Sequence, residues 1–543
     1  MFQAFERIAY NTGGNRRTHE NSPVHGVTMT IRRHLVVGLF AATASAVSLA
    51  WSQAPTPYRP ARPIALVGGL LIDATGTAAR PDHTVVISGD RIVDVGPRAS
   101  VKVPEGAEVI DARGMTIMPG LINSNQHVQL NPMYPAPTAN LPLANIKARW
   151  EYNWAQQPRR AWVYLMQGIT SLRQTSGPAK QILPVKQAID RGEIPGPRIF
   201  LGGALFMSDE HFADYAKERG MPSDAVAWMR DEFAYNVIDD VKGDTDKYLG
   251  PEFNYWKLYM ADARWDGKND FTDDELRFMI DKAHRAGKII DVHAGGHNAG
   301  LRRVLGFDVN TLEHPFYGRE LIDMDIIEGY VKKGVIVDTL LTVMIVGAQH
   351  AADPHRFDET RYTMSMDPRE HRMLMQYRDR MVQNLRKPKE PGAAIYDVAN
   401  PPDFPELRAN KGSAPENMTT TGRGPSVEQQ LRNVETSKEN MRRFIKAGAK
   451  FAMGTDTGSF LNFQQEDPNA NEMMYMVEMG MTPMQAIEAS TRNGAEALGL
   501  LKELGTIEKG KLADVIVVAG NPLENMAAMK RVYVVVKGGV RYK

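Results

Sequence analysis

Six polar residues of this sequence stand where short apolar runs come to an end, and their types are those that bind divalent cations. Imidazole, amide and carboxylate groups offer nitrogen and oxygen donors, and the chain has no cysteine that could offer a thiolate. Two of the six are two positions apart, so on a strand their side chains would point the same way. The six residues are Asn125, His127, Lys257, His293, His314 and Asp456.

Each of these residues also has an ordinary structural explanation. A single histidine is most often a satisfied structural group, and a lysine within a strand can extend its amine to solvent. An aspartate after a strand often caps a helix. The placement of all six at strand ends is harder to explain in this way, and it predicts a metal centre.

The elements that would position these residues alternate between short apolar strands and helical stretches, which is the pattern of a parallel sheet with crossover helices. Residues 273–287 and 431–448 carry apolar side chains at helical spacing. Eight such units predict a (β/α)8 TIM barrel of the α/β class, with its site at the carboxyl ends of the strands. The eight predicted strands cover residues 116–122, 168–174, 198–203, 255–260, 288–295, 309–314, 335–341 and 450–456.

β-branched runs broken by glycine and aspartate flank this middle on both sides. They predict one small β-sandwich domain built from residues 62–117 and 505–543, with the barrel over residues 118–504. Two stretches near 205–250 and 345–430 exceed a minimal barrel. They are insertions that act either as lids and substrate walls or as plain surface loops.

The amino end carries a pattern typical of exported proteins. Residues 29–54 combine two arginines, an apolar run and a small-residue cleavage site, as a signal peptide does. The run is short and rich in alanine and serine, which favours a removed signal over a membrane anchor. Residues 1–28 are polar and aperiodic, so we expect a non-native or disordered extension, and a mature protein that is periplasmic or secreted.

The charges of the 543 residues balance, with 65 Lys+Arg against 64 Asp+Glu. Nothing in this balance indicates a nucleic-acid partner. We expect a small-molecule or short-peptide substrate and no stable membrane anchor after signal cleavage, with a homo-oligomer left open.

The motifs around these residues resemble the amidohydrolase superfamily, in particular its imidazolonepropionase-like and prolidase-like branch, from about Arg62 to the carboxyl end. MPGLINSNQH stands where the family has PGLID-x-H-x-H, and GITSLRQ is similar to its GVTTVRD strand. KLYM carries the position of a bridging lysine, DVHAGG and TLEH carry two later histidines, and MGTDTG carries an aspartate.

This resemblance implies metal-dependent hydrolysis with one or two divalent metal ions, zinc first among them. The pair on the first strand and Asp456 would bind the more buried metal, and Lys257, carboxylated by carbon dioxide, would bridge to a second. His293 and His314 would hold that second metal. Asp456 would act as the general acid and base that moves the proton of the attacking water.

The chain departs from the family pattern at Asn125, where the first histidine is expected, and at Asn123, where the family has aspartate. An amide oxygen is a weaker ligand than imidazole. Three outcomes stay open: a binuclear centre with one poor site, a mononuclear enzyme, or a loss of catalysis. An Asn-x-His motif also occurs in a small group resembling phenylurea hydrolases, which work with one metal, and this favours retained catalysis.

We therefore predict hydrolysis of a carbon–nitrogen amide-type bond in a peptide, N-acyl amino acid, aryl amide or ureide. Esters, lactones and cyclic imides are alternative substrates of the same site, and a non-catalytic binding barrel is the alternative class of protein. No HAE-type proton-shuttle motif accompanies the fifth strand, which disfavours deamination. Four residues near strand ends are candidates for substrate contact: His297, Tyr259, Arg173 and Thr342. For His297, a role in orienting its loop is favoured over substrate contact.

Overall fold

The structure is a computed structural model, and it describes residues 62–128, 143–175, 177–205, 207–210, 212–213, 222–232, 237–260, 271–318, 320–358, 427–458 and 467–543, with isolated positions between 359 and 426. The predictions for residues 1–28 and 29–54, and most of the insertion near 345–430, lie outside the described residues. Within them, no helix is both long and apolar enough to cross a membrane.

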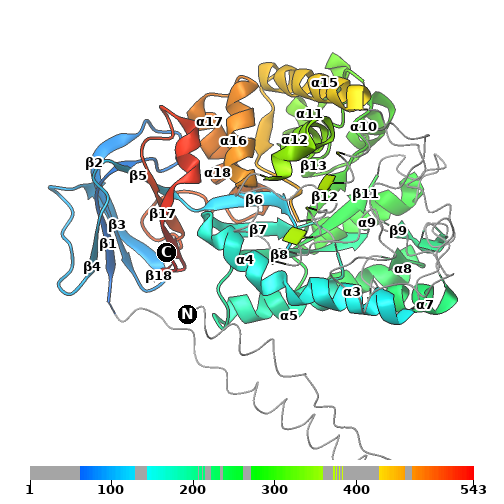
Figure 1. The fold of residues 1–543 in the computed structure, drawn as a ribbon, viewed down its shortest axis with the longest axis horizontal. Coiled ribbons are helices and arrows are strands. Elements are labelled where there is room, and N and C mark those ends of the chain that lie inside the picture. The colour runs from blue at the N-terminus through cyan, green and yellow to red at the C-terminus, as the bar shows by residue number, and fades with distance from the viewer. Residues whose placement is uncertain are drawn as a thin grey trace, which may run out of the picture. The chain divides into compact units, whose positions relative to one another are not determined.

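The central element is a sheet of eight strands, all parallel to their neighbours and arranged in chain order (Figure 1). The sheet closes on itself because the backbone after its last strand bonds to its first: Ser124 N donates to Met453 O at 2.7 Å, and Asp456 N donates to Asn125 O at 2.8 Å. The predicted (β/α)8 barrel is confirmed. Its strands are β6 (Leu121–Gln126), β7 (Ile169–Gln174), β8 (Arg198–Leu205), β11 (Tyr255–Tyr259), β12 (Ile289–His293), β13 (Thr311–Glu313), β14 (Ile336–Asp338) and β15 (Lys450–Ala452).

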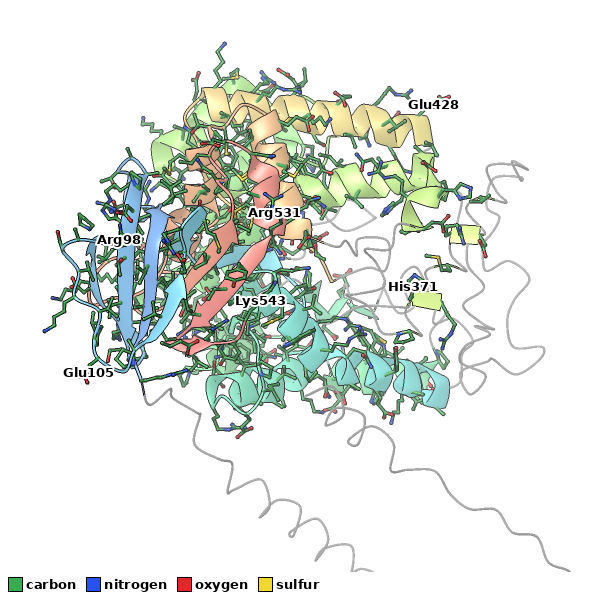
Figure 2. All side chains as sticks on the ribbon, turned by 60° about the vertical axis from the view of Figure 1, so that its left-hand side comes forward. Arg98, Glu105, His371, Glu428, Arg531 and Lys543 are labelled. Atoms are coloured by element: carbon green, nitrogen blue, oxygen red, sulfur yellow. The ribbon has the colours of Figure 1, made fainter. Side chains whose placement is uncertain are left out.

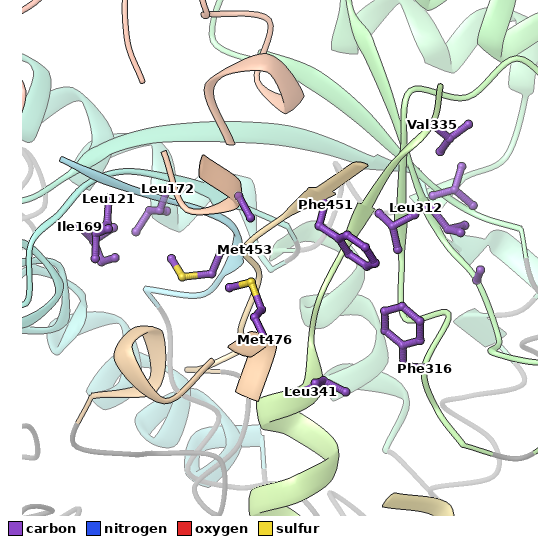
Figure 3. Packing of buried hydrophobic residues seen from close by; sticks show 14 of the residues in the cluster. Leu121, Ile169, Leu172, Leu312, Phe316, Val335, Leu341, Phe451, Met453 and Met476 are labelled. Atoms are coloured by element: carbon purple, nitrogen blue, oxygen red, sulfur yellow. The ribbon is translucent and has the colours of Figure 1, made fainter. Parts of the chain in front are cut away.

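Helices cover the outside of these strands, and the apolar layer between the two includes Leu172, Leu312 and Met453 (Figure 3). One of them, α9, shows why the sequence is helical there. Thr272 accepts a hydrogen bond from Glu275 N, while the Glu275 side chain accepts one from Thr272 N at 2.8 Å. The helices are α4 (Gln157–Met166), α5 (Ala179–Asp190), α9 (Asp273–Arg285), α10 (Asn298–Leu305), α11 (Met324–Lys333), α12 (Leu341–Ala352), α15 (Val427–Lys446), α16 (Pro468–Glu478), α17 (Pro483–Ala489) and α18 (Arg492–Ala497).

Between the barrel units, the described parts of the inserted stretches form short elements. α3 lies between β6 and β7, and its Trp154 ring lies 6.0 Å from Trp228 of α7. The elements are α3 (Leu143–Ala155), β9 (Met207–Ser208), α7 (Ser223–Glu232), β10 (Val237–Ile238), α8 (Val241–Asp244), η1 (Thr245–Tyr248) and η2 (Pro354–Asp358).

A second sheet of eight strands contains both ends of the described chain, because β16 pairs antiparallel with β5. Strand β1 changes partner along its length, pairing with β4 over Ile64–Val67 and with β5 at Leu70–Leu71. The loop residues Arg98 and Glu105 extend from this sheet in Figure 2. Its strands are β1 (Ile64–Leu71), β2 (Arg80–Ser88), β3 (Arg91–Pro97), β4 (Glu108–Asp111), β5 (Met115–Pro119), β16 (Val515–Ala519), β17 (Val532–Lys537) and β18 (Val540–Arg541), and η5 (Met526–Lys530) precedes β17.

The two faces of β16 join this small sheet to the barrel. Val515 and Val517 point into the core of the small sheet, whereas Ile516 and Val518 belong to the large core that includes the barrel. This is the alternation that a strand buried on both faces produces.

One sequence prediction is corrected here: residues 116–122 are two strands and not one. β5 runs to Pro119 in the small sheet, and β6 starts the barrel at Leu121, so the expected boundary between residues 117 and 118 falls inside β5. Gly120 separates the two strands. A Cβ atom there would lie 2.3 Å from Thr170 Oγ1, so only glycine allows the chain to pass this point.

Candidate metal centre

The backbone is strained at two of the six predicted site residues. His314 follows β13 with φ of 56°, and Asp456 follows β15 with φ of 53°. Residues other than glycine adopt this left-handed backbone region at a cost of about 1 kcal/mol or more, so the surrounding structure must hold these two residues in that conformation. Both residues are thereby turned out of the strand direction at the carboxyl end of the barrel.

Two imidazoles form the middle of the site. The rings of His293 and His314 lie 4.3 Å apart, and each has a tyrosine against its outer side. Tyr259 stacks on His293 at 4.4 Å, and Tyr317 stacks on His314 at 4.9 Å. Burial, together with the neighbouring His293, lowers the pKa of His314 well below its usual range. The ring is therefore neutral at pH 7, which is the form that binds metal ions.

Lys257 and Glu313 border these imidazoles. The Lys257 amine forms an ion pair with the Glu313 carboxylate, and both side chains are buried. One ligand atom each from His293, Glu313 and His314 lie within 4.8 Å of one another. Burial and the nearby Asp291 raise the pKa of Glu313 well above its usual range, against the opposing charge of Lys257. The sequence analysis did not single out Glu313, although it directly precedes His314 in TLEH.

The opposite side of the site contains the pair from the first barrel strand. Asn125 and His127 do point the same way, because the Thr175 hydroxyl lies 2.6 Å from Asn125 Oδ1 and 3.5 Å from His127 Nε2. His127 Nε2 lies 2.7 Å from Asp456 Oδ1. Burial acts to raise the pKa of Asp456, but the hydrogen bond from His127 and the charges of the surrounding basic residues together outweigh it, so the pKa lies below its usual value.

Arg173 does not lie on the rim, and its predicted contact with substrate is wrong. Its side chain is fully buried beneath the site, with Nη2 2.6 Å from Asp338 Oδ2 and 3.1 Å from Asp291 Oδ1. Nη1 donates to Thr311 Oγ1 at 2.9 Å. Although burial acts to lower it, these carboxylates raise the pKa of Arg173 above its ordinary value. Arg173 is the cation of a buried charge layer under the site.

Thr342 is also misplaced in the prediction, because it is buried in the first turn of α12. Its backbone nitrogen donates to Glu472 Oε2 at 2.7 Å, so the residue belongs to the start of the helix. His297 caps α10, where its Nδ1 accepts a hydrogen bond from Gly300 N at 3.1 Å, as its loop interpretation predicted. Tyr259 stacks on the candidate ligand His293, so its predicted place at the site agrees with the geometry.

A model of the amidohydrolase family matches residues 116–541, which cover the barrel and the returning strands of the small sheet. The chain belongs to the amidohydrolase family. The family relationship that the sequence motifs predicted is therefore confirmed.

Known proteins are similar to this chain over a short or a long share of its length. The imidazolonepropionase of Shouchella clausii (strain KSM-K16) is 34% identical over 107 residues, which are 19% of this chain and 24% of that protein. The match thus spans about a quarter of the length of this curated relative. A Xaa-Pro dipeptidase with bound methionine is 21% identical with a TM-score of 0.62, covering 89% of this chain and 100% of the other. Phenylurea hydrolase B is 21% identical with a TM-score of 0.59, covering 88% and 96%.

The donor set on one side of the amidohydrolase site fits a divalent metal ion. His293 and His314 supply imidazole nitrogens, and Asp456 is an ionised carboxylate in the same buried space, since its charge acts on His314. Nitrogen and oxygen donors of this kind suit zinc and related ions. The pair Asn125 and His127 is different, because Asn125 Oδ1 is already hydrogen-bonded to Thr175 and His127 Nε2 to Asp456.

Proposed function

We propose that this protein is a metal-dependent hydrolase of a carbon–nitrogen amide-type bond. The observation that carries the proposal is the convergence of His293, His314, Lys257 and Asp456 at the carboxyl end of one barrel, with strained backbone at two of them. Strain of this kind persists where function requires it. Two structural neighbours, a Xaa-Pro dipeptidase and phenylurea hydrolase B, are named as hydrolases, which supports this class of reaction.

His293 and His314 would hold the metal ion, and Lys257, as a carbamate formed with carbon dioxide, would supply an oxygen ligand. The bound ion, zinc in our proposal, would polarise the scissile carbonyl and make its water a stronger nucleophile. Asp456 accepts the proton of the attacking water, because its lowered pKa keeps the carboxylate ionised. The same carboxyl group then donates that proton to the leaving nitrogen.

Tyr259 and Tyr317 shape the space next to this chemistry. Their rings stack on the two imidazoles and hold each ring in one orientation. Because they also exclude water from one side of each imidazole, they strengthen the electrostatic interactions inside the site.

The cellular location is part of the proposal. A signal peptide at residues 29–54 would be removed, and the mature enzyme would be periplasmic or secreted. Sequencing the amino terminus of the protein recovered from a periplasmic fraction tests this. A mature chain that begins near residue 55 supports export, and an intact amino terminus in the cytoplasmic fraction contradicts it.

A hydrolysis screen tests the activity. Purified protein is incubated with N-acyl amino acids, dipeptides and aryl ureas in the presence of zinc, manganese or cobalt, and with esters, lactones and cyclic imides as the competing class. We expect metal-dependent cleavage of an amide or urea that Asp456→Asn abolishes. Cleavage of esters alone would contradict the amide assignment. Absence of bound metal, with an Asp456→Asn variant indistinguishable from the natural protein, would favour a binding barrel.

A further inference from the structure

We propose that His127 binds no metal ion and instead positions the Asp456 carboxylate by a hydrogen bond, which leaves one metal ion in the centre. The consequence for catalysis rests on the proposed function.

The orientation of the Gln174 side chain is set by the backbone. Val128 N donates to Gln174 Oε1 at 2.7 Å, and a backbone N–H can only donate. The oxygen end of the amide therefore faces Val128, and the nitrogen end is directed elsewhere. Gln174 Nε2 lies 3.2 Å from His127 Nδ1. Because an amide NH2 group is a donor, Nδ1 must accept and carries no proton.

Because Nδ1 accepts, the ring proton must lie on the other ring nitrogen, Nε2. His127 Nε2 lies 2.7 Å from Asp456 Oδ1, and an ionised carboxylate only accepts hydrogen bonds. One tautomer, with its proton on Nε2, satisfies both contacts. A metal-binding histidine needs the reverse, with a free lone pair toward the metal and an N–H toward an acceptor. Here that N–H would face the NH2 group of Gln174.

The neighbouring Asn125 does not supply a better ligand. Its Oδ1 already accepts a hydrogen bond from Thr175 Oγ1 at 2.6 Å, and its side chain is fully buried. Its Nδ2 has no hydrogen-bond partner, and an amide nitrogen does not ligate a cation. Both members of the strand-one pair thus present N–H groups where the family resemblance predicts lone pairs.

Gln174 is the residue that decides this arrangement. The family strand that this segment resembles, GVTTVRD, ends in aspartate at the position of Gln174. A carboxylate could accept from Val128 N and from an Nδ1–H at the same time, so the opposite tautomer would be stable. The predicted ligand role of His127 is thereby revised to a positioning role.

Counting metal ions tests the proposal without any substrate. The full chain is loaded with zinc, dialysed, and its zinc content is measured by mass spectrometry. We expect one zinc per chain in the natural protein and one in His127→Ala. We expect a second zinc only when Asn125→His is combined with the nearly isosteric Gln174→Glu. Two zinc ions in the natural protein, and the loss of one in His127→Ala, would overturn the proposal.

A charge-matched control separates the role of Gln174 from the effect of an added acid. Gln126 ends β6 directly before His127 and is fully buried, and the alternation of side chains along a strand predicts that it faces away from His127. Gln126→Glu combined with Asn125→His should keep one zinc per chain, after thermal unfolding has confirmed that each variant folds. A second zinc in this control would contradict the assignment to Gln174.

Two further measurements keep the positioning role distinct from a structural one. In His127→Ala, kcat should fall by about 10- to 100-fold while KM and zinc content stay unchanged. If the chain binds no zinc at all, the proposed function fails, but nitrogen NMR of labelled histidine still reports the tautomer. A proton on Nε2 of His127 supports the proposal, and a proton on Nδ1 refutes it.

Discussion

At the carboxyl ends of its strands the barrel buries ionisable groups, whereas at the amino ends it buries the apolar face of the small sheet. Gly168, just before β7, packs against Ile516 and Val532, so the amino end is closed by hydrophobic contact. The carboxyl end has His314 and Asp456 in strained backbone and a charge layer around Arg173 directly below them.

This difference separates stability from function within one fold. Apolar burial at the amino end stabilises the barrel by about 25 cal/mol for each Å² removed from water. Buried charges contribute little net stability, but the loss of one partner is costly. The carboxyl end therefore gains chemical capability at a cost in stability that the amino end offsets.

The largest expected effect is on the catalytic rate at the carboxyl end of the barrel. Asp456→Asn keeps the shape of the side chain but removes the proton acceptor, and we expect kcat to fall by about 10³-fold. Asp82→Asn is the matched control, because Asp82 also has a positive φ, of 52°, but is exposed in the small sheet. An equal loss of activity in both variants would show that backbone strain, and not proton transfer, is responsible.

The next effect is on stability. Arg173→Met leaves Asp291, Glu313 and Asp338 buried without their guanidinium, and we expect the free energy of unfolding to fall by about 3–5 kcal/mol in urea titrations. Arg198→Met at the amino end removes a partly exposed partner of Asp514, which keeps its bond from Gly538 N. The free energy of unfolding should fall by clearly less in Arg198→Met than in Arg173→Met. A larger fall in Arg198→Met would contradict the difference between the two ends of the barrel.

Metal affinity gives a third test. His314→Ala removes an imidazole from the centre, and we expect the zinc dissociation constant to rise by at least about 100-fold, the upper effect of removing an outer-shell partner. His83→Ala in β2 of the small sheet should leave zinc binding as it was, since His83 contacts the Pro81 carbonyl there. Equilibrium dialysis distinguishes the two, and unchanged affinity in His314→Ala would remove this residue from the centre.

The smallest effect concerns the amino end and pH. Burial and the nearby Arg198 lower the pKa of Lys537 from 10.5 to about 8. The folded state therefore loses this proton before the unfolded state does, so this lysine destabilises the fold below pH 8 and the penalty disappears as pH rises toward 10.5. Relative to Lys537→Met, the natural protein should gain about 1 kcal/mol of unfolding free energy between pH 7 and 9. A difference that stays constant with pH would show that Lys537 keeps its ordinary pKa.

Much of the fold could be predicted because barrel strands are short apolar runs that end in polar residues. Seven of the eight barrel strands lie where the sequence predicted them, the exception being β6, and residues that follow the strands meet at one site. The division at Gly120 was missed, since an apolar run does not show which of two sheets each half joins. Backbone pairing with Val515 on one side and Ile169 on the other decides that.

The sequence by itself determined which chemical groups stand at strand ends, because alternation and strand length follow from local residue pattern. Only the tertiary structure decided what those groups do. Arg173 and Asp338 are 165 positions apart, and no local pattern reveals that they form one ion pair. His127 has the residue type of a ligand, but the proton on its ring is set by Gln174 and Asp456, which reach it from two other strands. Burial brings these distant donors and acceptors within hydrogen-bond distance, and so fixes the role of each.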